Sequence, residues 1–222
     1  MNKLNHIAFI MDGNGRWGKK NKKSRNFGHI QGVETVKKIV SSSIKFEIPI
    51  ISFYVFSSEN WKRPKKEIVF LFKLIHSYFT KEIKSLISQN IKINILGELS
   101  KLPSDIKSTL KKTMKLTKKN KKIIVNLAIN YGSKNEILNA FKSNKNKINI
   151  KNLEKNLYTK KMPNPDILIR TGGHQRLSNF MLWQLAYAEL FFLKKLWPDF
   201  NSKDLKSIIN KYKKSKRNFG SL

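Results

Sequence analysis

Short apolar runs alternate with amphipathic segments along the whole chain. Runs rich in Ile, Val, Phe and Tyr that stop at turn residues are typical of buried strands, whereas apolar residues spaced three or four apart are typical of helices. The predicted strands cover residues 6–11, 49–56, 91–97, 122–130, 166–173 and 188–193. The predicted helices cover residues 32–46, 65–89, 102–120, 133–142, 150–158, 178–187 and 202–216.

This alternation predicts the fold class. Strands separated by helices favour a single α/β domain, residues 1–222, with a central, largely parallel six-stranded sheet flanked by helices. A chain of 222 residues with 40% hydrophobic residues can bury one substantial core. The predicted helix 65–89 is unusually aromatic in "VFLFKLIHSYF". Core packing explains that composition, and so does an apolar tunnel, which needs the same side chains.

The composition excludes some kinds of binding site and bears on where in the cell the protein is expected. The chain has no cysteine, which excludes disulfides and thiolate metal sites. Its first residues, "MNKLNHIAFIMDGNG", lack the layout of a signal peptide, and no stretch approaches the roughly 20 apolar residues of a membrane span. We therefore expect a cytoplasmic protein.

The net charge of +32 raises the hypothesis of nucleic-acid binding, because clustered Lys and Arg neutralise phosphates. The lysines are spread along the whole chain, however, and the aromatic residues lie inside apolar runs instead of alternating with basic residues. We predict no specific nucleic-acid partner. The charge still predicts a surface that attracts anions, including diphosphates and anionic lipid headgroups.

Three polar clusters follow predicted strands: "MDGNGRW" (11–17), "FSSENWKRP" (56–64) and "RTGGHQRLSNF" (170–180). Turn chemistry alone would explain the Gly and Asn residues of any one cluster. Three clusters that each carry Arg with small or hydroxyl residues are harder to explain as turns. Because ligands of open parallel sheets bind outside the carboxyl ends of the strands, we expect a binding site at that edge.

The chemistry of the clusters suits a diphosphate. Glycines let backbone N–H groups approach phosphate oxygens, and guanidinium groups bind phosphate in a bidentate manner. The candidate arginines are Arg16, Arg25, Arg63, Arg170 and Arg176. The carboxylate of Asp12 fits among phosphates if Mg²⁺ lies between them. The glycine spacing matches neither the P-loop nor the dinucleotide fingerprint.

Six motifs resemble the cis-prenyltransferase family, in particular the bacterial undecaprenyl diphosphate synthases. They are "HIAFIMDGNGRW", "GHIQGVE", "FYVFSSENWKRP", "LAINYGS", "RTGGHQRLSNFMLWQLAYAELFF" and "WPDF". The resemblance implies Mg²⁺-dependent condensation of successive isopentenyl diphosphates onto farnesyl diphosphate, giving undecaprenyl diphosphate, the lipid carrier for cell-wall synthesis. It also implies a homodimer that contacts the inner membrane transiently as it releases its product.

The resemblance assigns roles to individual residues. It implies catalytic roles for Asp12 and Asn60, and metal-associated carboxylates at Asp12 and Glu189, the latter also at the dimer interface. The residues implied for the allylic diphosphate are Gly13, Asn14, Gly15, Arg16, Trp17, Arg25 and His29. The residues implied for the loop that links the two substrate sites are Ser57, Ser58, Glu59, Asn60, Trp61, Arg63 and Glu67. Those implied for isopentenyl diphosphate are Arg170, Arg176 and Ser178.

The resemblance leaves three points open: the identity of the general base, the role of the C-terminal motif and the metal contact of one loop. The general base is Asp12, Asn60 acting with His29, or an oxygen of the released diphosphate. The terminal "KRNFG", with Arg217 and Gly220, resembles an ending of the family that reaches a neighbouring subunit. The family has Glu where His174 stands, followed here by Gln175, so any metal contact from this loop is left open. Because Asp12 is present, we predict the catalytic chain and not the non-catalytic partner subunit that some members use.

Overall fold

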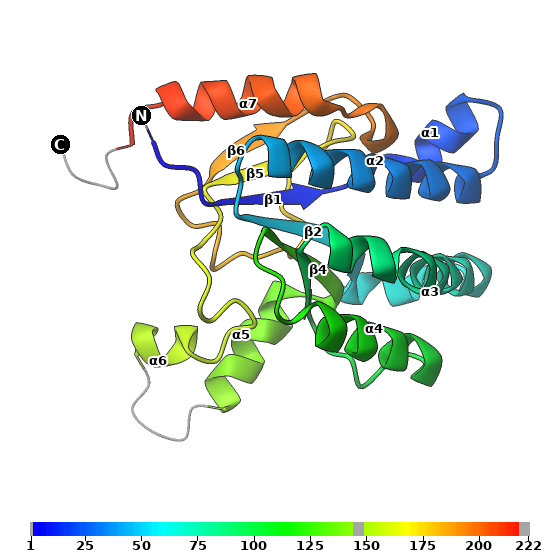
Figure 1. Cartoon of the computed structure of the whole chain (residues 1–222), viewed down its shortest axis with the longest axis horizontal. Coiled ribbons are helices and arrows are strands. Elements are labelled where there is room, and N and C mark those ends of the chain that lie inside the picture. The colour runs from blue at the N-terminus through cyan, green and yellow to red at the C-terminus, as the bar shows by residue number, and fades with distance from the viewer. Residues whose placement is uncertain (1, 144–148, 218–222) are drawn as a thin grey trace.

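The computed structural model describes residues 2–143 and 149–217. Its strands are β1 (His6–Ile10), β2 (Ile50–Ser57), β3 (Ile91–Leu96), β4 (Ile123–Tyr131), β5 (Ile167–Arg170) and β6 (Glu189–Phe192). Its α-helices are α1 (Asn14–Lys20), α2 (Arg25–Lys45), α3 (Lys65–Ser88), α4 (Ser104–Thr117), α5 (Ser133–Lys142), α6 (Ile150–Glu154) and α7 (Ser202–Lys214). Two 3₁₀ helices, η1 (Ser58–Lys62) and η2 (Trp197–Asp199), complete the elements shown in Figure 1.

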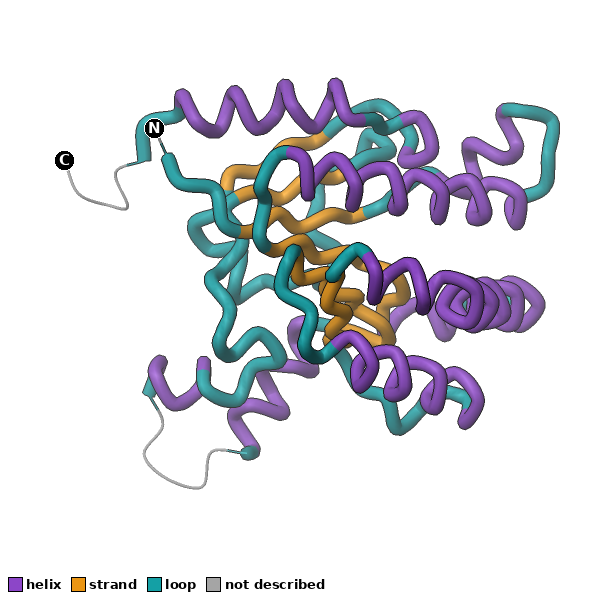
Figure 2. The backbone as a smooth tube through the Cα atoms, viewed as in Figure 1, coloured by secondary structure: helices purple, strands orange, loops and turns teal. Residues whose placement is uncertain are grey.

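The six strands form one sheet in the order β3-β4-β2-β1-β5-β6, and every neighbouring pair is parallel. Parallel neighbours need crossover connections, and helices on the flanks of the sheet supply them (Figure 2), except between β5 and β6, where the connection consists of turns. The predicted six-stranded α/β fold is therefore confirmed, and the sheet is parallel throughout. Gly220 lies outside the residues that the structure describes.

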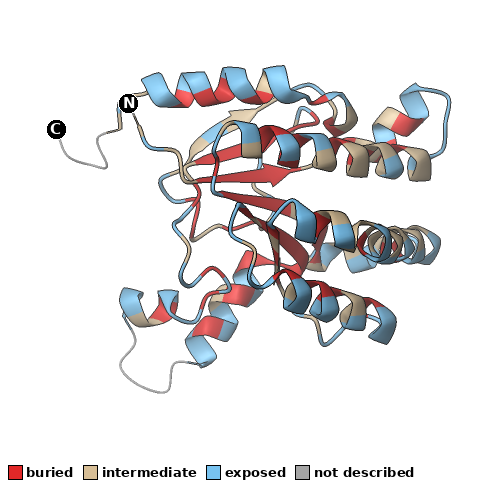
Figure 3. Cartoon of the chain, in the orientation of Figure 1, coloured by how far each residue is buried: buried red, intermediate tan, exposed pale blue. Residues whose placement is uncertain are grey.

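Both faces of the sheet are buried, which explains why the strands are almost continuously apolar. Ile7 and Phe9 of β1 join the core beneath α2, α3, α4 and α7, the helices that lie in a row across one face (Figure 1). Ala8 and Ile10 join a second core with Phe180 on the opposite face. Figure 3 shows the buried strands between helices whose outer surfaces are exposed.

The predicted helix 178–187 is wrong. The segment is a series of turns, and Ser178, Asn179 and Met181 have φ angles of 50°, 62° and 46°, in the left-handed region. Long-range hydrogen bonds hold it in this form. The Asn179 side chain accepts a hydrogen bond from the backbone N–H of Lys134 at 2.9 Å, and the N–H of Leu182 donates to the hydroxyl of Ser133 at 2.9 Å. Tertiary contacts therefore override the local helical pattern.

The helix predicted from residue 32 begins at Arg25, and the short helix α1 precedes it. Ser24 caps α2 by accepting a hydrogen bond from the N–H of Phe27. A Cβ on Gly28 would collide with the carbonyl of Asn14, so glycine at this position lets α1 and α2 pack backbone to backbone. The remaining predicted elements are present, some with shorter ends.

His6 is a buried histidine whose pKa predicts how stability changes with pH. Its ring nitrogens lie 2.7 Å from the Ser52 hydroxyl and 2.8 Å from the Pro163 carbonyl, and burial lowers its pKa to about 4. The unfolded chain binds a proton near pH 6.5, so stability contributed by neutral His6 is lost as the pH falls from about 6.5 toward about 4. We expect a loss of roughly 3 kcal/mol over that window. Urea unfolding at several pH values tests this, and His6→Gln should have the flatter profile; identical slopes would contradict it.

Candidate active site

The predicted site lies where the sheet changes its direction of winding. The chain passes from β1 to β2 on one side of β1, and later returns to place β5 on the other side. Such switch points at the carboxyl ends of parallel strands form crevices in which ligands bind. Asp12 lies two residues beyond the end of β1, and Arg170 is the last residue of β5, paired with Ile10.

Asp12 is held by two guanidinium groups. Arg16 donates through Nη2 to Oδ1 at 3.1 Å, and Arg170 donates through Nη2 to Oδ2 at 3.0 Å. The Asp12 carbonyl accepts a hydrogen bond from the Thr171 hydroxyl at 2.8 Å. The Arg170 side chain is only 4% exposed and that of Asp12 is 27% exposed. The pair therefore places a buried cation beside a carboxylate that solvent and ligands can reach.

The segment after β5 folds back over Arg170. Nη1 of Arg170 donates to the Ser178 hydroxyl at 2.7 Å and to the backbone carbonyl of Arg176. Gly172 turns the chain with a φ of 90°, and a Cβ there would collide with the Arg16 guanidinium. Arg176 lies exposed at the rim of the site, whereas Arg170 forms its floor.

The Glu67 carboxylate contacts three basic side chains. Its carboxylate lies 3.3 Å from Arg25, 3.3 Å from Arg63 and 3.5 Å from Nε2 of His29. Burial alone would raise the pKa of Glu67, but the hydrogen bond from Arg25 and the charges of Arg25 and Arg63 outweigh it and lower the pKa. Burial is also the main reason that the pKa of His29 is lowered, so this imidazole is neutral at neutral pH.

The loop after β2 is fixed by its own contacts. The Asn60 side chain accepts a hydrogen bond from the N–H of Ser57 at 3.2 Å. Nε1 of Trp61 donates to the Asn130 side chain at 2.8 Å, and Glu59 accepts from Asn179 at 2.8 Å. Trp61 and Glu59 therefore attach the loop to β4 and to the turn segment, while Ser57 and Asn60 face the site.

A polar cavity of about 220 Å³ joins eight of the predicted site residues. They are Asp12, Asn14, His29, Ser57, Asn60, Arg63, Arg170 and Ser178. The predicted residues outside this lining are Gly13, Gly15, Arg16, Trp17, Arg25, Ser58, Glu59, Trp61, Glu67, Arg176 and Glu189. Arg16 contacts Asp12 and Glu67 contacts His29, both in the lining, and Arg25 contacts Glu67. Trp17 stacks on Phe27 and donates to Asp199.

Sequence reasoning missed the apolar and aromatic part of the lining: Ile10, Met11, Tyr54, Val55 and Leu71. The Tyr54 hydroxyl donates to the carbonyl of Ser178 at 3.2 Å, which joins β2 to the turn segment. The register of β2 against β4 shifts between Tyr54 and Ser57. Such irregularities re-aim side chains near active sites, and strict strand alternation in the sequence does not reveal them.

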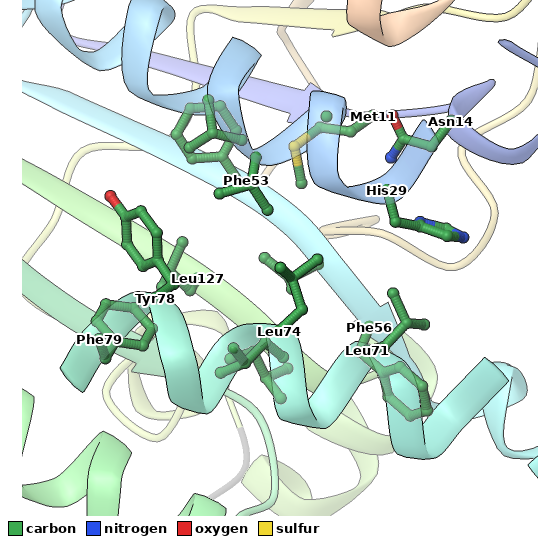
Figure 4. A pocket seen from close by; sticks show the side chains of 16 residues that line it. Met11, Asn14, His29, Phe53, Phe56, Leu71, Leu74, Tyr78, Phe79 and Leu127 are labelled. Atoms are coloured by element: carbon green, nitrogen blue, oxygen red, sulfur yellow. The ribbon is translucent and has the colours of Figure 1, made fainter. Parts of the chain in front are cut away.

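A second, apolar cavity of about 120 Å³ adjoins the first. The two share Met11, Asn14, His29, Val55 and Leu71. Figure 4 shows Asn14 and His29 at one end of the apolar cavity and Tyr78, Phe79 and Leu127 at the other. Its walls come from α2, α3 and the strands β2 and β4, so the aromatic residues of α3 line a space as well as the core.

The residues present suit a magnesium ion that is shared with a substrate. Within residues 2–143 and 149–217 no three His, Cys, Asp or Glu side chains gather as a metal site. Mg²⁺ often binds through one or two carboxylates together with substrate phosphates and water, and Asp12 offers such a carboxylate. Buried Oδ1 of Asn14 and Nε of Arg170 lack hydrogen-bond partners among the described residues, as is common where a ligand or water completes a site.

Glu189 does not lie with Asp12. It pairs with Ile167 at the start of β6, whereas Arg170, the partner of Asp12, pairs with Phe192 at the end of that strand. Three residues of strand separate the two levels by about 10 Å. Within one chain the two carboxylates therefore lie at different levels of the sheet, and the association of Glu189 with a metal and with the dimer interface stays a prediction.

Comparisons with known proteins agree with this geometry. Residues 10–220 match the prenyltransferase family model described as undecaprenyl diphosphate synthase. The chain is 42% identical to an isoprenyl transferase of Clostridium perfringens, with 98% of this chain and 90% of the relative covered. It is 43% identical to an isoprenyl transferase of Helicobacter pylori, with coverages of 100% and 98%.

Two solved structures are similar over almost all of both chains. Lavandulyl diphosphate synthase from Lavandula x intermedia, in complex with dimethylallyl diphosphate, superposes with a TM-score of 0.93 at 32% identity, covering 98% of each chain. A probable undecaprenyl diphosphate synthase from Campylobacter jejuni superposes with a TM-score of 0.86 at 35% identity, covering 100% of each. The fold, the site and these similarities define a cis-prenyltransferase enzyme. The chain belongs to the undecaprenyl diphosphate synthase family.

Proposed function

We propose that this enzyme condenses successive isopentenyl diphosphates onto farnesyl diphosphate, with Mg²⁺, to give undecaprenyl diphosphate, the lipid carrier for cell-wall synthesis. The observation that carries the proposal is that a cavity lined by Asp12, Arg63 and Arg170 shares part of its wall with an apolar cavity beneath α2 and α3. A substrate with a diphosphate head and an isoprenoid tail fits both at once. The dimethylallyl diphosphate named with the lavender enzyme is a substrate of this chemical kind and supports the proposal.

In this proposal the diphosphate of the allylic substrate lies between Asp12 and the two arginines that contact Glu67, Arg25 and Arg63. The apolar tail of the same substrate enters the apolar cavity. Backbone N–H groups at the start of α1, behind Gly13 and Gly15, add donors for its oxygens. Isopentenyl diphosphate lies against Arg170, Ser178 and the exposed Arg176. Asp12 would hold Mg²⁺ at this site, and the ion would supply positive charge that favours departure of the diphosphate.

Chain elongation forms a bond between the terminal alkene carbon of isopentenyl diphosphate and the allylic C1 as the C1–O bond to diphosphate breaks. A proton then leaves C2 of the isopentenyl unit, and the new double bond forms. The guanidinium groups of Arg63 and Arg25 stabilise the charge that develops on the departing diphosphate. Three acceptors for the proton remain in reach of the cavity: Asp12, neutral His29 acting with Asn60, and an oxygen of the diphosphate.

Incorporation of radiolabelled isopentenyl diphosphate into butanol-extractable product tests the proposal. We expect incorporation that requires farnesyl diphosphate, ends on addition of EDTA, returns with excess Mg²⁺, and yields undecaprenyl diphosphate on chain-length analysis. Absence of incorporation with farnesyl, geranyl or dimethylallyl diphosphate would refute elongation. Full activity in EDTA would refute the role of the metal, and a single shorter product would refute the assignment of undecaprenyl diphosphate.

We also propose a homodimer that uses the β6 edge of the sheet. β6 ends the strand order, and its Leu190 is 43% exposed while neighbouring Tyr187 is 68% exposed. An edge strand with exposed apolar side chains is a natural surface for a second copy. Light scattering of the chain and of Leu190→Lys tests this, because the variant should have the mass of a monomer.

The proposed location is the cytoplasm, with transient contact at the inner membrane. No helix within the described ranges is both long and apolar enough to span a bilayer. A product with a long apolar tail must nonetheless leave for a membrane, and a chain with a net charge of +32 is attracted to anionic lipid. Sedimentation with vesicles of anionic and neutral lipid, during turnover and without substrate, tests this contact; equal binding to both would refute the electrostatic part.

A further inference from the structure

Three segments that are far apart in the sequence meet beside the polar cavity: the end of β4, the start of η1 and the turn segment, residues 178–187. Gly132, just after β4, marks their closest approach. A Cβ on Gly132 would lie 2.5 Å from the Ser58 hydroxyl and 2.8 Å from Nδ2 of Asn179, distances that Cβ atoms essentially never show. Glycine at this position therefore lets both η1 and the turn segment pack closely against the end of β4.

The Asn179 side chain connects these segments. Its Nδ2 donates to Oε1 of Glu59, in η1, at 2.8 Å, and its Oδ1 accepts from the backbone N–H of Lys134 at 2.9 Å. The Asn179 carbonyl accepts a further hydrogen bond from the N–H of Ser133 at 2.8 Å. One residue of the turn segment therefore joins η1 to the start of α5.

Asn179 stands next to a residue of the candidate site. Ser178 and Asn179 have φ angles of 50° and 62°, in the left-handed region, which Asn adopts more readily than most residues. Ser178 lines the polar cavity and accepts a hydrogen bond from Arg170 at 2.7 Å. Asn179 is not part of that lining and contacts η1 and α5. The position of Ser178 is therefore coupled, through its neighbour, to the position of η1.

The bond between Asn179 and Glu59 requires a donor on the side of Asn179. Burial alone would raise the pKa of Glu59, but hydrogen bonds from Asn179 and from its own loop outweigh burial and lower the pKa. The carboxylate is therefore ionised at neutral pH and only accepts hydrogen bonds. Glu59 is exposed, and η1 is also attached through the bond from Trp61 to Asn130. Loss of the bond to Asn179 should therefore displace η1 without unfolding the chain.

We propose that Asn179 is a positioning residue, which holds η1 against the segment that carries Ser178 so that both face the same bound substrate. The inference rests on the proposed function, in which Ser178 binds isopentenyl diphosphate. Breaking the bond lets η1 move relative to Ser178 and weakens the binding of isopentenyl diphosphate. The allylic diphosphate is less affected, because Glu67 holds its arginines, Arg25 and Arg63.

The test compares KM and kcat of purified full-length variants, with farnesyl diphosphate and labelled isopentenyl diphosphate. Asn179→Asp keeps the side-chain size and the acceptor for Lys134, but it places a second carboxylate against Glu59. KM for isopentenyl diphosphate should rise roughly tenfold, and KM for farnesyl diphosphate by less than about threefold. Asn135→Asp, which adds the same charge at an exposed position in the first turn of α5, is the matched control and should keep both wild-type values.

A reversed pair tests the bond itself. In the double variant Glu59→Gln/Asn179→Asp, the introduced amide can donate to the introduced carboxylate, which restores the bond with its direction reversed. The rise in KM caused by Asn179→Asp should therefore be less than about threefold when it is measured against Glu59→Gln alone. Glu59→Ala breaks the bond from its exposed end and should raise KM for isopentenyl diphosphate by a factor similar to Asn179→Asp. It takes the place of Asn179→Asp in the test if that variant does not fold.

Thermal unfolding, measured on the same variants, separates positioning from a merely structural role. Positioning predicts a changed KM for one substrate in a protein whose unfolding temperature is close to that of the wild type. A kcat that falls with the folded fraction, while both KM values stay unchanged, would overturn the proposal. An equal rise in KM for Asn179→Asp in the wild-type and Glu59→Gln backgrounds would also overturn it. Failure of the wild type to incorporate any isopentenyl unit would refute the proposed function itself.

Discussion

Asp12→Ala is expected to lower kcat by on the order of a hundredfold or more, because Asp12 is the carboxylate proposed to connect the metal with the diphosphate. The structure adds a second reason for a large effect. Asp12 accepts hydrogen bonds from both Arg16 and Arg170, so its removal also releases two phosphate-binding groups from their positions. Steady-state kinetics at saturating concentrations of both substrates and a range of Mg²⁺ concentrations measure this loss.

Two matched variants separate these reasons. Asp12→Asn keeps the volume and a hydrogen-bond acceptor for Arg170 but removes the charge, so it should lose activity while excess Mg²⁺ restores little. Asp105→Ala, which removes an exposed carboxylate in the first turn of α4, should keep normal turnover. Near-normal turnover in Asp12→Asn would show that the charge of Asp12 has no part in the mechanism.

Arg170 and Arg176 are expected to differ sharply when each is replaced by Ala. Arg170→Ala leaves the Asp12 carboxylate, the Ser178 hydroxyl and a backbone carbonyl without their shared donor. It should lower stability by roughly 1.5–3 kcal/mol and impair both binding and turnover. Arg176 is exposed, so Arg176→Ala should leave stability unchanged and raise KM for isopentenyl diphosphate by roughly tenfold to a hundredfold through one lost charge-assisted contact.

The distinction is measured by thermal unfolding together with KM for each substrate. KM for farnesyl diphosphate should change little in Arg176→Ala, and Arg176→Lys should recover part of the affinity because a single charge remains. If Arg176→Ala raised both KM values equally, the assignment of the two substrate sites would be wrong. If Arg170→Ala kept full stability, its contacts with Asp12 and Ser178 would be dispensable for folding.

The strands and the location of the site were predictable from the sequence because both depend on short-range signals. Continuous apolar runs identify strands that are buried on both faces, and each polar cluster directly follows a strand. Parallel pairing then brings "MDGNGRW", "FSSENWKRP" and "RTGGHQRLSNF" to one edge without any knowledge of side-chain contacts. The resemblance added the roles of residues such as Asn14 and Ser178, which line the cavity as expected.

Features that depend on contacts between distant segments were not predictable. The helix expected over 178–187 gives way to turns because Asn179 and Leu182 bond to residues at the start of α5. α2 begins earlier than predicted because Gly28 lets its first turns pack against α1. Helix propensity alone treats a glycine at this position as unfavourable for a helix. Tyr54 lines the polar cavity next to a register shift between β2 and β4, and the alternation of residues in the sequence does not reveal that shift.

The central position of β1 in the sheet has a consequence for synthesis on the ribosome. One edge of β1 can pair with β2 as soon as the first quarter of the chain has emerged, but the other edge waits for β5. Asp12 and Arg170 are separated by 158 residues, so the enzyme has no complete active site until most of its nascent chain is available. Long-range parallel pairing of this kind is slow and leaves strand edges uncovered in the meantime. The lysines that are spread along the chain keep those intermediates charged and mutually repelling while β1 waits for its second partner.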